Sequence, residues 1–121
     1  MKLEIHSFAD IGDISKERLV LRALDDINIG DYVILRSKRS NDGGPLSGAK
    51  SAYWLPDVVV KVGDLIILYT KTGAAGKKAL SRDRTAHFYY WRMKEAIWGA
   101  DKGNIAIVLE SKSWESKSPV S

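Results

Sequence analysis

Short apolar stretches separated by turn residues recur along the whole chain. They read "LEIHSF", "RLVLRAL", "YVILRS", "YWLP", "VVVKV", "DLIILYT", "HFYYW" and "NIAIVLE". Several of them are rich in Val, Ile and Tyr and are bounded by Gly, Asp, Asn or Pro, which is typical of strands in a β-sandwich or barrel. The pattern therefore predicts an all-β fold, an antiparallel β-sandwich of about seven to nine strands.

Two of the predicted strands lack the usual alternation of apolar and polar residues. "LIILY" and "IAIVL" are apolar on both faces, whereas a sandwich strand normally has one polar face. Either β-propensity allows Ile and Val on exposed positions, or long loops or a second subunit cover the outer face, because large exposed apolar patches are rare on monomers. The residues predicted to lie in or near the core include Tyr32, Leu65, Ile67, Trp98 and Val108.

The segment "SRDRTAHFYYWRMKEAIW", residues 81–98, is open to two interpretations. Its second half has some helical character, but "HFYYW" has the composition of a strand. As a strand it places Phe88 and Tyr90 on one face and His87, Tyr89 and Trp91 on the other. One of these two sets must then face the core.

Length and composition favour one domain, residues 1–121, with a flexible tail at residues 115–121. The absence of cysteine excludes disulfides, zinc–thiolate sites and thiol catalysis. The N-terminal residues carry Lys2, Glu4, His6 and Asp10 and lack the apolar core of a signal peptide. No stretch approaches the roughly 20 apolar residues of a membrane span. We therefore expect no membrane association and a cytoplasmic or otherwise intracellular location.

The positive charge is concentrated in the middle of the chain. The formal net charge is +4, but residues 36–94 contain twelve Lys and Arg against four Asp and Glu, and the remainder contains seven against eleven. Two long polar connections are predicted in this part, residues 37–52 and residues 71–86. Loops of this length in a compact domain are usually functional or disordered.

Basic residues beside aromatic residues raise the hypothesis of nucleic-acid binding. Cations neutralise phosphates, and flat rings stack on bases. In a second interpretation, the aromatic residues fill the core and the Lys and Arg residues keep the loops soluble. The basic residues that could contact phosphate are Arg36, Lys38, Arg39, Lys71, Lys77, Lys78, Arg82, Arg84, Arg92 and Lys94.

Residues suited to catalysis are scarce. His6 and His87 are the only histidines, and neither lies in a nucleophile or metalloprotease motif. The acids that stand near turns are Asp25, Asp26, Asp57 and Asp64. Such acids usually bond to their own backbone. We expect no enzymatic activity, no bound metal and no cofactor.

Three segments in order resemble the lamin tail domain, which is an immunoglobulin-like β-sandwich. They are "ERLVLRAL…INIGDYVI", "YWLPDVVVKVGDLIILYTKTGAAG" and "FYYW…AIWGADKGNIAIVLESKSW". The resemblance covers roughly residues 17–114. The positions that match structural residues of the family include Tyr32, Pro56, Gly63, Trp98 and Gly103.

The chain also departs from the family pattern. Tyr32 stands at the usual Trp, Leu55 at the usual Phe and Asn104 at the usual Asp, and a basic insert lies between Gly76 and His87. In lamins this domain is a non-catalytic module that contacts proteins and DNA. The resemblance therefore implies a non-catalytic binding module here. Before the strand "IAIVL", we expect Gly103 to adopt a backbone angle that a larger residue would resist.

Two functions are consistent with the sequence. The first is an interaction module that binds an unidentified protein partner or its own copy through the outer sheet and loops. The second is weak, nonspecific nucleic-acid binding through the basic residues 36–39 and 71–94. Salt dependence separates them, because phosphate contacts weaken steeply with salt.

Overall fold

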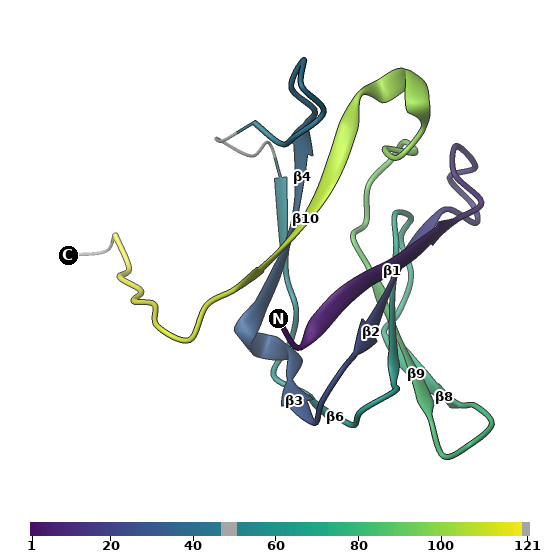
Figure 1. Cartoon of the computed structure of the whole chain (residues 1–121), viewed down its shortest axis with the longest axis vertical. Helices are drawn as coiled ribbons and strands as arrows, with labels where there is room; N and C mark the ends of the chain where they lie inside the picture. Colours follow the sequence, from purple (N-terminus) through teal and green to yellow (C-terminus); the bar gives the residue numbers. More distant parts are fainter. Residues whose placement is uncertain (47–50, 120–121) are drawn as a thin grey trace.

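The chain folds into two packed layers of β-strands in a computed structural model that describes residues 1–46 and 51–119. The larger layer is a five-stranded sheet in the order β1-β2-β7-β9-β8 (Figure 1). Its strands are β1 (Leu3–Ala9), β2 (Arg18–Ala23), β7 (Leu65–Tyr69), β9 (Thr85–Tyr90) and β8 (Gly76–Ala79). A β-sandwich is therefore confirmed as the architecture.

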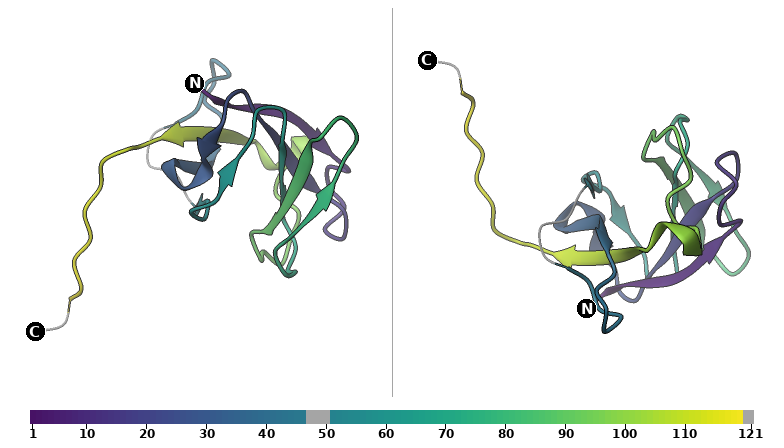
Figure 2. Two further views of the ribbon diagram at one scale, coloured as in Figure 1. Left: turned by 90° about the horizontal axis from the view of Figure 1, so that it is seen from below. Right: turned by 90° about the horizontal axis from the view of Figure 1, so that it is seen from above.

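The second layer is a three-stranded antiparallel sheet in the order β10-β4-β5. It consists of β10 (Asn104–Glu110), β4 (Tyr32–Lys38) and β5 (Ser51–Trp54). The short strands β3 (Ile27–Asn28) and β6 (Val59–Val60) pair at one end of the sandwich, and single turns of 3-10 helix, η1 (Ile29–Asp31) and η2 (Ala100–Lys102), precede β4 and β10. Figure 2 shows the last described residues running away from the two layers as an extended segment.

Two details of the sheets differ from the sequence prediction. The described residues form ten strands rather than about seven to nine. Most neighbours are antiparallel, but β7 and β9 pair in parallel. The difference arises because the basic insert supplies an additional strand, β8, which pairs with β9 at the edge of the sheet. The predicted loop at residues 71–86 is thus partly a strand.

Residues 81–98 contain a strand and no α-helix. Residues 85–90 form β9, so the helical interpretation of this segment is wrong. On β9, His87 and Tyr89 face inward and are buried, whereas Phe88 and Tyr90 are on the outer face and only partly buried. Residues 47–50 of the other predicted loop and residues 120–121 of the predicted tail lie outside the described residues.

The core lies between the two sheets and is mainly aliphatic. Tyr32 and Trp98 are buried in it, and Val108 packs against it, as predicted. Leu65 and Ile67 were predicted to lie in or near the core, but they are half-buried on the outer face, and their neighbours Ile66 and Leu68 fill the core instead. β7 is apolar on both faces, so its sequence could not show which face points inward.

A buried carboxylate connects distant parts of the chain. Glu17 is completely buried at the start of β2, and its carboxylate accepts hydrogen bonds from the backbone N–H groups of Gly12, Ile97 and Trp98 and from the hydroxyl of Thr70. Because each oxygen has two donors, the charge is well compensated by hydrogen bonds. Glu17 thereby fixes the segment that follows β9 to the ends of β2 and β7.

The turn residues behave as their chemistry predicts. Gly103 ends η2 with φ of 64°, in the left-handed region, and Gly63 has φ of 89° just before β7. Pro56 follows the end of β5, outside the hydrogen-bonded ladder.

Among the described residues, no helix is long and apolar enough to cross a bilayer.

Candidate functional site

The outer face of the three-stranded sheet is apolar across all three strands. Two rows of side chains cross it: Leu109 pairs with Val33 and Val33 with Trp54, and Ile107 pairs with Leu35 and Leu35 with Ala52. We call these residues the apolar face. Its members are Val33, Leu35, Ala52, Trp54, Ile107 and Leu109.

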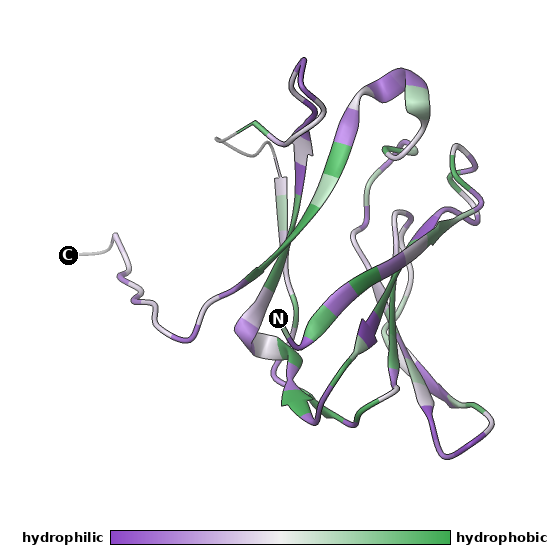
Figure 3. Ribbon diagram, in the orientation of Figure 1, coloured by the Kyte–Doolittle hydropathy of each residue, from purple (hydrophilic) through white to green (hydrophobic). Residues whose placement is uncertain are grey.

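The apolar face is partly open to solvent: Ala52, Trp54 and Leu109 are exposed, and its other three residues are half-buried. Leu109 is 45% exposed and Trp54 is 53% exposed, whereas the inward neighbours Tyr32 and Ile34 are buried. Figure 3 shows hydrophobic residues along the middle of β10 and β4, and no further layer of the described chain covers them on the side away from the five-stranded sheet (Figures 1 and 3). A contiguous exposed apolar area of this kind marks an interaction surface more often than a neutral surface.

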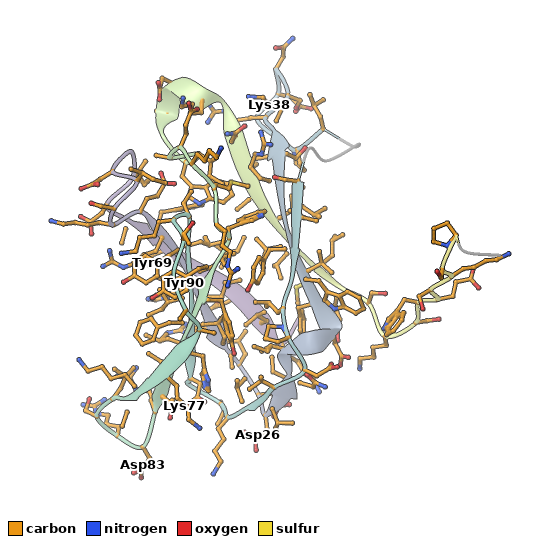
Figure 4. The ribbon with its side chains drawn as sticks, turned by 180° about the vertical axis from the view of Figure 1, so that it is seen from behind. Asp26, Lys38, Tyr69, Lys77, Asp83 and Tyr90 are labelled. Carbon is orange, nitrogen blue, oxygen red and sulfur yellow. The ribbon has the colours of Figure 1, made fainter. Side chains whose placement is uncertain are left out.

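The outer face of the five-stranded sheet also contains apolar residues, and two cations cover Tyr69 at its centre strand β7. The guanidinium of Arg18 lies 5.8 Å from the ring centroid of Tyr69, and the amine of Lys71 lies 5.0 Å from it. Tyr69 also stacks on Tyr90 with ring centroids 5.2 Å apart (Figure 4), and Gly73 lies against the ring of Tyr90. These contacts occupy the faces of the rings, so they are not free to stack on bases.

A small pocket lies at one end of the apolar face. Its volume is about 220 Å³, and it is lined by Asp31, Val33, Trp54, Ser111, Trp114, Glu115 and Ser116. Trp54 and Trp114 meet edge to face, with centroids 5.0 Å apart and an interplanar angle of 82°. The indole N–H of Trp54 donates to the carbonyl oxygen of Gly30 at 2.7 Å, which fixes the orientation of this ring.

The basic residues singled out from the sequence fall into three separate groups. Arg36, Lys38 and Arg39 lie at the end of β4, where Arg36 Nε donates to the hydroxyl of Ser51 and Lys38 Nζ donates to the carbonyl oxygen of Lys102. The second group follows β7 and β9, where the backbone N–H of Arg92 donates to the carbonyl oxygen of Lys71. It consists of Lys71, Arg92 and Lys94.

The third group lies on the β8–β9 hairpin and consists of Lys77, Lys78, Arg82 and Arg84. Lys38 and Lys77 are at opposite ends of the molecule (Figure 4). Arg82 and Asp83 form the tip of the hairpin with φ of 62° and 59°. The structure therefore brings four of the ten proposed cations onto one hairpin and separates the other six from it.

A histidine–aspartate pair lies on the inner side of this hairpin. His87 Nε2 is 3.0 Å from Asp64 Oδ2, and both residues are buried. Burial acts to raise the pKa of Asp64, but hydrogen bonds from His87 and from the backbone N–H groups of Thr85 and Lys61 outweigh it and lower the pKa below its ordinary value. Asp64 thus joins the start of β7 to β9, a longer-range role than the turn bonding expected from sequence.

The sequence indicated an apolar outer side for the strand "IAIVL", but the residues of β4 and β5 that complete the apolar face and the two tryptophans at its end were not predicted. A signal was present, because "IAIVL" is apolar at every position and Trp114 stands in an otherwise polar segment. The side chains that share a face became clear only from the register of β10, β4 and β5.

The sequence also gave no sign that Asp64 meets His87, because their pairing depends on the parallel contact of β7 with β9.

In comparisons with known proteins, no family model, no curated protein and no solved structure matches this chain.

Proposed function

We propose that this protein is a non-catalytic interaction module that binds a protein partner, or a second copy of itself, through the apolar face. The observation that carries the proposal is an uncharged row across three paired strands, in which Leu109 and Trp54 are exposed and Val33 between them is half-buried. Burial of such a row is favourable by about 25 cal/mol for each Å² removed from water. The resemblance of residues 17–114 to the lamin tail domain agrees with this proposal.

The apolar face suits a protein better than it suits a nucleic acid. None of its six residues is charged, whereas nucleic-acid binding depends on cations that contact phosphate. Exposed aromatic and aliphatic side chains are typical of the centre of a protein interface.

Site-specific photo-crosslinking tests the proposal. We would place a benzophenone amino acid at Leu109 and, as a matched control, at Leu24, which is 44% exposed and lies in the turn between β2 and β3. Each variant is irradiated alone and in an extract of the source cells. We expect a defined adduct, to a partner or to a second copy, from position 109 only. The proposal is wrong if position 109 gives no adduct that position 24 does not also give.

Nucleic-acid binding is the second candidate, and the β8–β9 hairpin is the observation that favours it. All four residues of β8 are exposed, and Lys77 and Lys78 on this strand share one hairpin with Arg82 and Arg84, although successive strand side chains point to opposite faces. We propose that this contact is weak and independent of sequence, because Tyr69 and Tyr90 are engaged by other side chains and by Gly73, and the exposed groups of the hairpin are mainly cations that contact phosphate.

We propose no catalytic role for His87 and Asp64. Asp64 accepts three hydrogen bonds, from Thr85, Lys61 and His87. A general base for hydrolysis needs a nucleophile or a water molecule positioned by further groups. Among the described residues, no group of three or more metal-ligating side chains is present. These features support a structural role for the pair.

A further inference from the structure

We infer that the pocket between Trp54 and Trp114 binds a methylated ammonium group on a lysine side chain of the partner protein. The inference rests on the proposed function, because the pocket adjoins the apolar face through Val33 and Trp54, which belong to both. The inference names the chemical group of the partner that would be recognised next to the apolar face.

The shape of the pocket comes from two tryptophan rings at nearly a right angle. With an interplanar angle of 82° and centroids 5.0 Å apart, the edge of one ring contacts the face of the other, so the two rings meet as a corner at the side of the pocket. The hydrogen bond from Trp54 to Gly30 holds one wall in place before any ligand arrives. A rounded group can therefore touch both rings, and little ordering of the Trp54 side chain is needed on binding.

The charge around the pocket selects a cation. Asp31 and Glu115 are among the lining residues, and no Lys, Arg or His is. The face of an indole ring is electronegative and attracts cations, with Trp the strongest of the aromatic residues. Phosphates and carboxylates would be repelled by both the acids and the rings. A neutral aliphatic side chain would fill the space without using the charge.

Methylation of the cation matches the apolar walls. A bare lysine ammonium is compact and strongly hydrated, and the two indole walls cannot replace its water. Methyl groups reduce that hydration and make contact with both rings, while the positive charge remains. Recognition of such groups by aromatic side chains is a known use of the cation–π interaction. A sugar ring, by contrast, needs a flat platform rather than two perpendicular walls.

A lysine side chain is the carrier that the surroundings favour. A partner chain lying on the apolar face would pass the mouth of the pocket, where an aliphatic stem can lie along Val33 and Trp54. A choline headgroup has the same cation, but it carries an adjacent phosphate that would face Asp31 and Glu115.

Titration followed by tryptophan fluorescence and calorimetry tests the inference. The probes are N-acetyl-trimethyllysine methylamide, its unmethylated form, its neutral carbon isostere and phosphocholine. We expect the trimethylated probe to bind roughly tenfold more tightly than the unmethylated probe and the isostere, which is the size of a desolvated cation–π contact. Equal binding of the isostere would overturn the role of charge. Tighter binding of phosphocholine would overturn the lysine carrier.

Variants locate the binding in the pocket. Trp114→Ala should abolish the difference between the probes, and because Trp114 is 63% exposed and lies after the last strand, its loss cannot disrupt the core. The double change Asp31→Asn and Glu115→Gln should weaken binding of the trimethylated probe several-fold and leave the isostere unchanged. Val62→Ala, at another exposed apolar position, is the control and should behave as wild type. Selectivity that survives Trp114→Ala would place the ligand elsewhere and overturn the inference.

The two proposals can fail separately. If position 109 crosslinks to a partner but no probe distinguishes methylated from unmethylated lysine, the pocket inference is wrong and the interaction face stands. If the methylated probe binds but position 109 gives no specific adduct, the pocket recognises a cation that a partner on the apolar face does not supply, and the partner lysine is overturned.

Discussion

At the scale of single residues, buried acids fix the ends of the strands. Glu17 accepts four hydrogen bonds from three different segments, and Asp64 accepts three from two segments. Each is an acceptor at a place where backbone N–H groups would otherwise be buried without a partner. Removing the charge while keeping the shape therefore tests each role directly.

Replacing Glu17 with Gln should lower the free energy of unfolding by about 3 kcal/mol, because an amide nitrogen would then face backbone donors in the buried site. Urea denaturation measures the loss. Glu115→Gln is a matched control, since Glu115 lies beyond the last strand, and it should change stability little. A Glu17→Gln variant as stable as wild type would show that the hydrogen bonds at this site contribute nothing to stability.

Replacing Asp64 with Asn should make stability less dependent on pH. The folded-state pKa of Asp64 is lowered, so the ionised carboxylate stabilises the fold above the unfolded-state value of about 3.9, and this contribution is lost as pH falls through the folded-state pKa. We expect the variant to be less stable than wild type at pH 7, with a deficit that narrows below about pH 4. Thermal unfolding at pH 7 and at several pH values below about 4 measures the effect.

The control for that experiment is Asp83→Asn. Asp83 is exposed at the tip of the β8–β9 hairpin with φ of 59°, an angle that Asn tolerates well. The Asp83→Asn variant should show the same dependence of stability on pH as wild type. A constant deficit for Asp64→Asn at every pH would indicate that shape rather than charge is important at this position.

At the scale of elements, the β8–β9 hairpin and the three-stranded sheet present opposite kinds of surface. The hairpin gathers four cations on an exposed edge strand and its turn, and lysines on such an edge also discourage pairing with another strand. The apolar face, by contrast, contains no charged residue. This contrast makes the two elements separable by mutation.

Replacing Lys77, Lys78, Arg82 and Arg84 with Ala should reduce duplex DNA binding and its salt dependence. If all four contact phosphate, the slope of log affinity against log salt falls by roughly 3 to 4. Fluorescence anisotropy at several salt concentrations measures it. Replacing Arg36, Lys38 and Arg39 with Ala is the control, because Lys38 lies at the other end of the molecule from Lys77 (Figure 4) and Arg36 and Arg39 are its near neighbours at the end of β4. Equal losses from both sets would contradict a hairpin-centred contact.

At the scale of the whole molecule, the sandwich core is independent of the C-terminal segment. The core residues lie between residues 3 and 98, and the contacts of residues 111–114 with the sandwich include the Ser111 backbone bond to Asp31 and the Trp54–Trp114 ring contact. The free energy of unfolding of a chain that ends at Ser111 should therefore differ from that of wild type by no more than about 1 kcal/mol, as for substitutions away from the core.

The same truncation should abolish methylammonium selectivity, because it removes one wall of the pocket. Circular dichroism and urea denaturation measure the fold, and probe titration measures the pocket. A large loss of stability on truncation would show that the segment is part of the fold and would weaken the use of Trp114 variants as a clean test.

Much of the fold could be predicted from local patterns. β2, β4, β9 and β10 coincide with apolar stretches bounded by turn residues, and the alternation in "HFYYW" correctly separated His87 and Tyr89 from Phe88 and Tyr90. The strand β8 was missed, because "GKKA" has no large apolar residue and no strong β-propensity and is a strand only through its pairing with β9. The orientation of β7 was also missed, since both of its faces are apolar.

The sequence by itself determined the all-β class, the turns at Gly63 and Gly103 and the burial of Tyr32 and Trp98, because these depend on local periodicity, backbone freedom and side-chain size. Tertiary structure alone decided which strands pair and in which register. Register brings Leu109, Val33 and Trp54 into one row, although they are far apart in the chain. It also brings His87 to Asp64 and separates the basic groups. Such contacts depend on the packing of whole sheets, which no local pattern encodes.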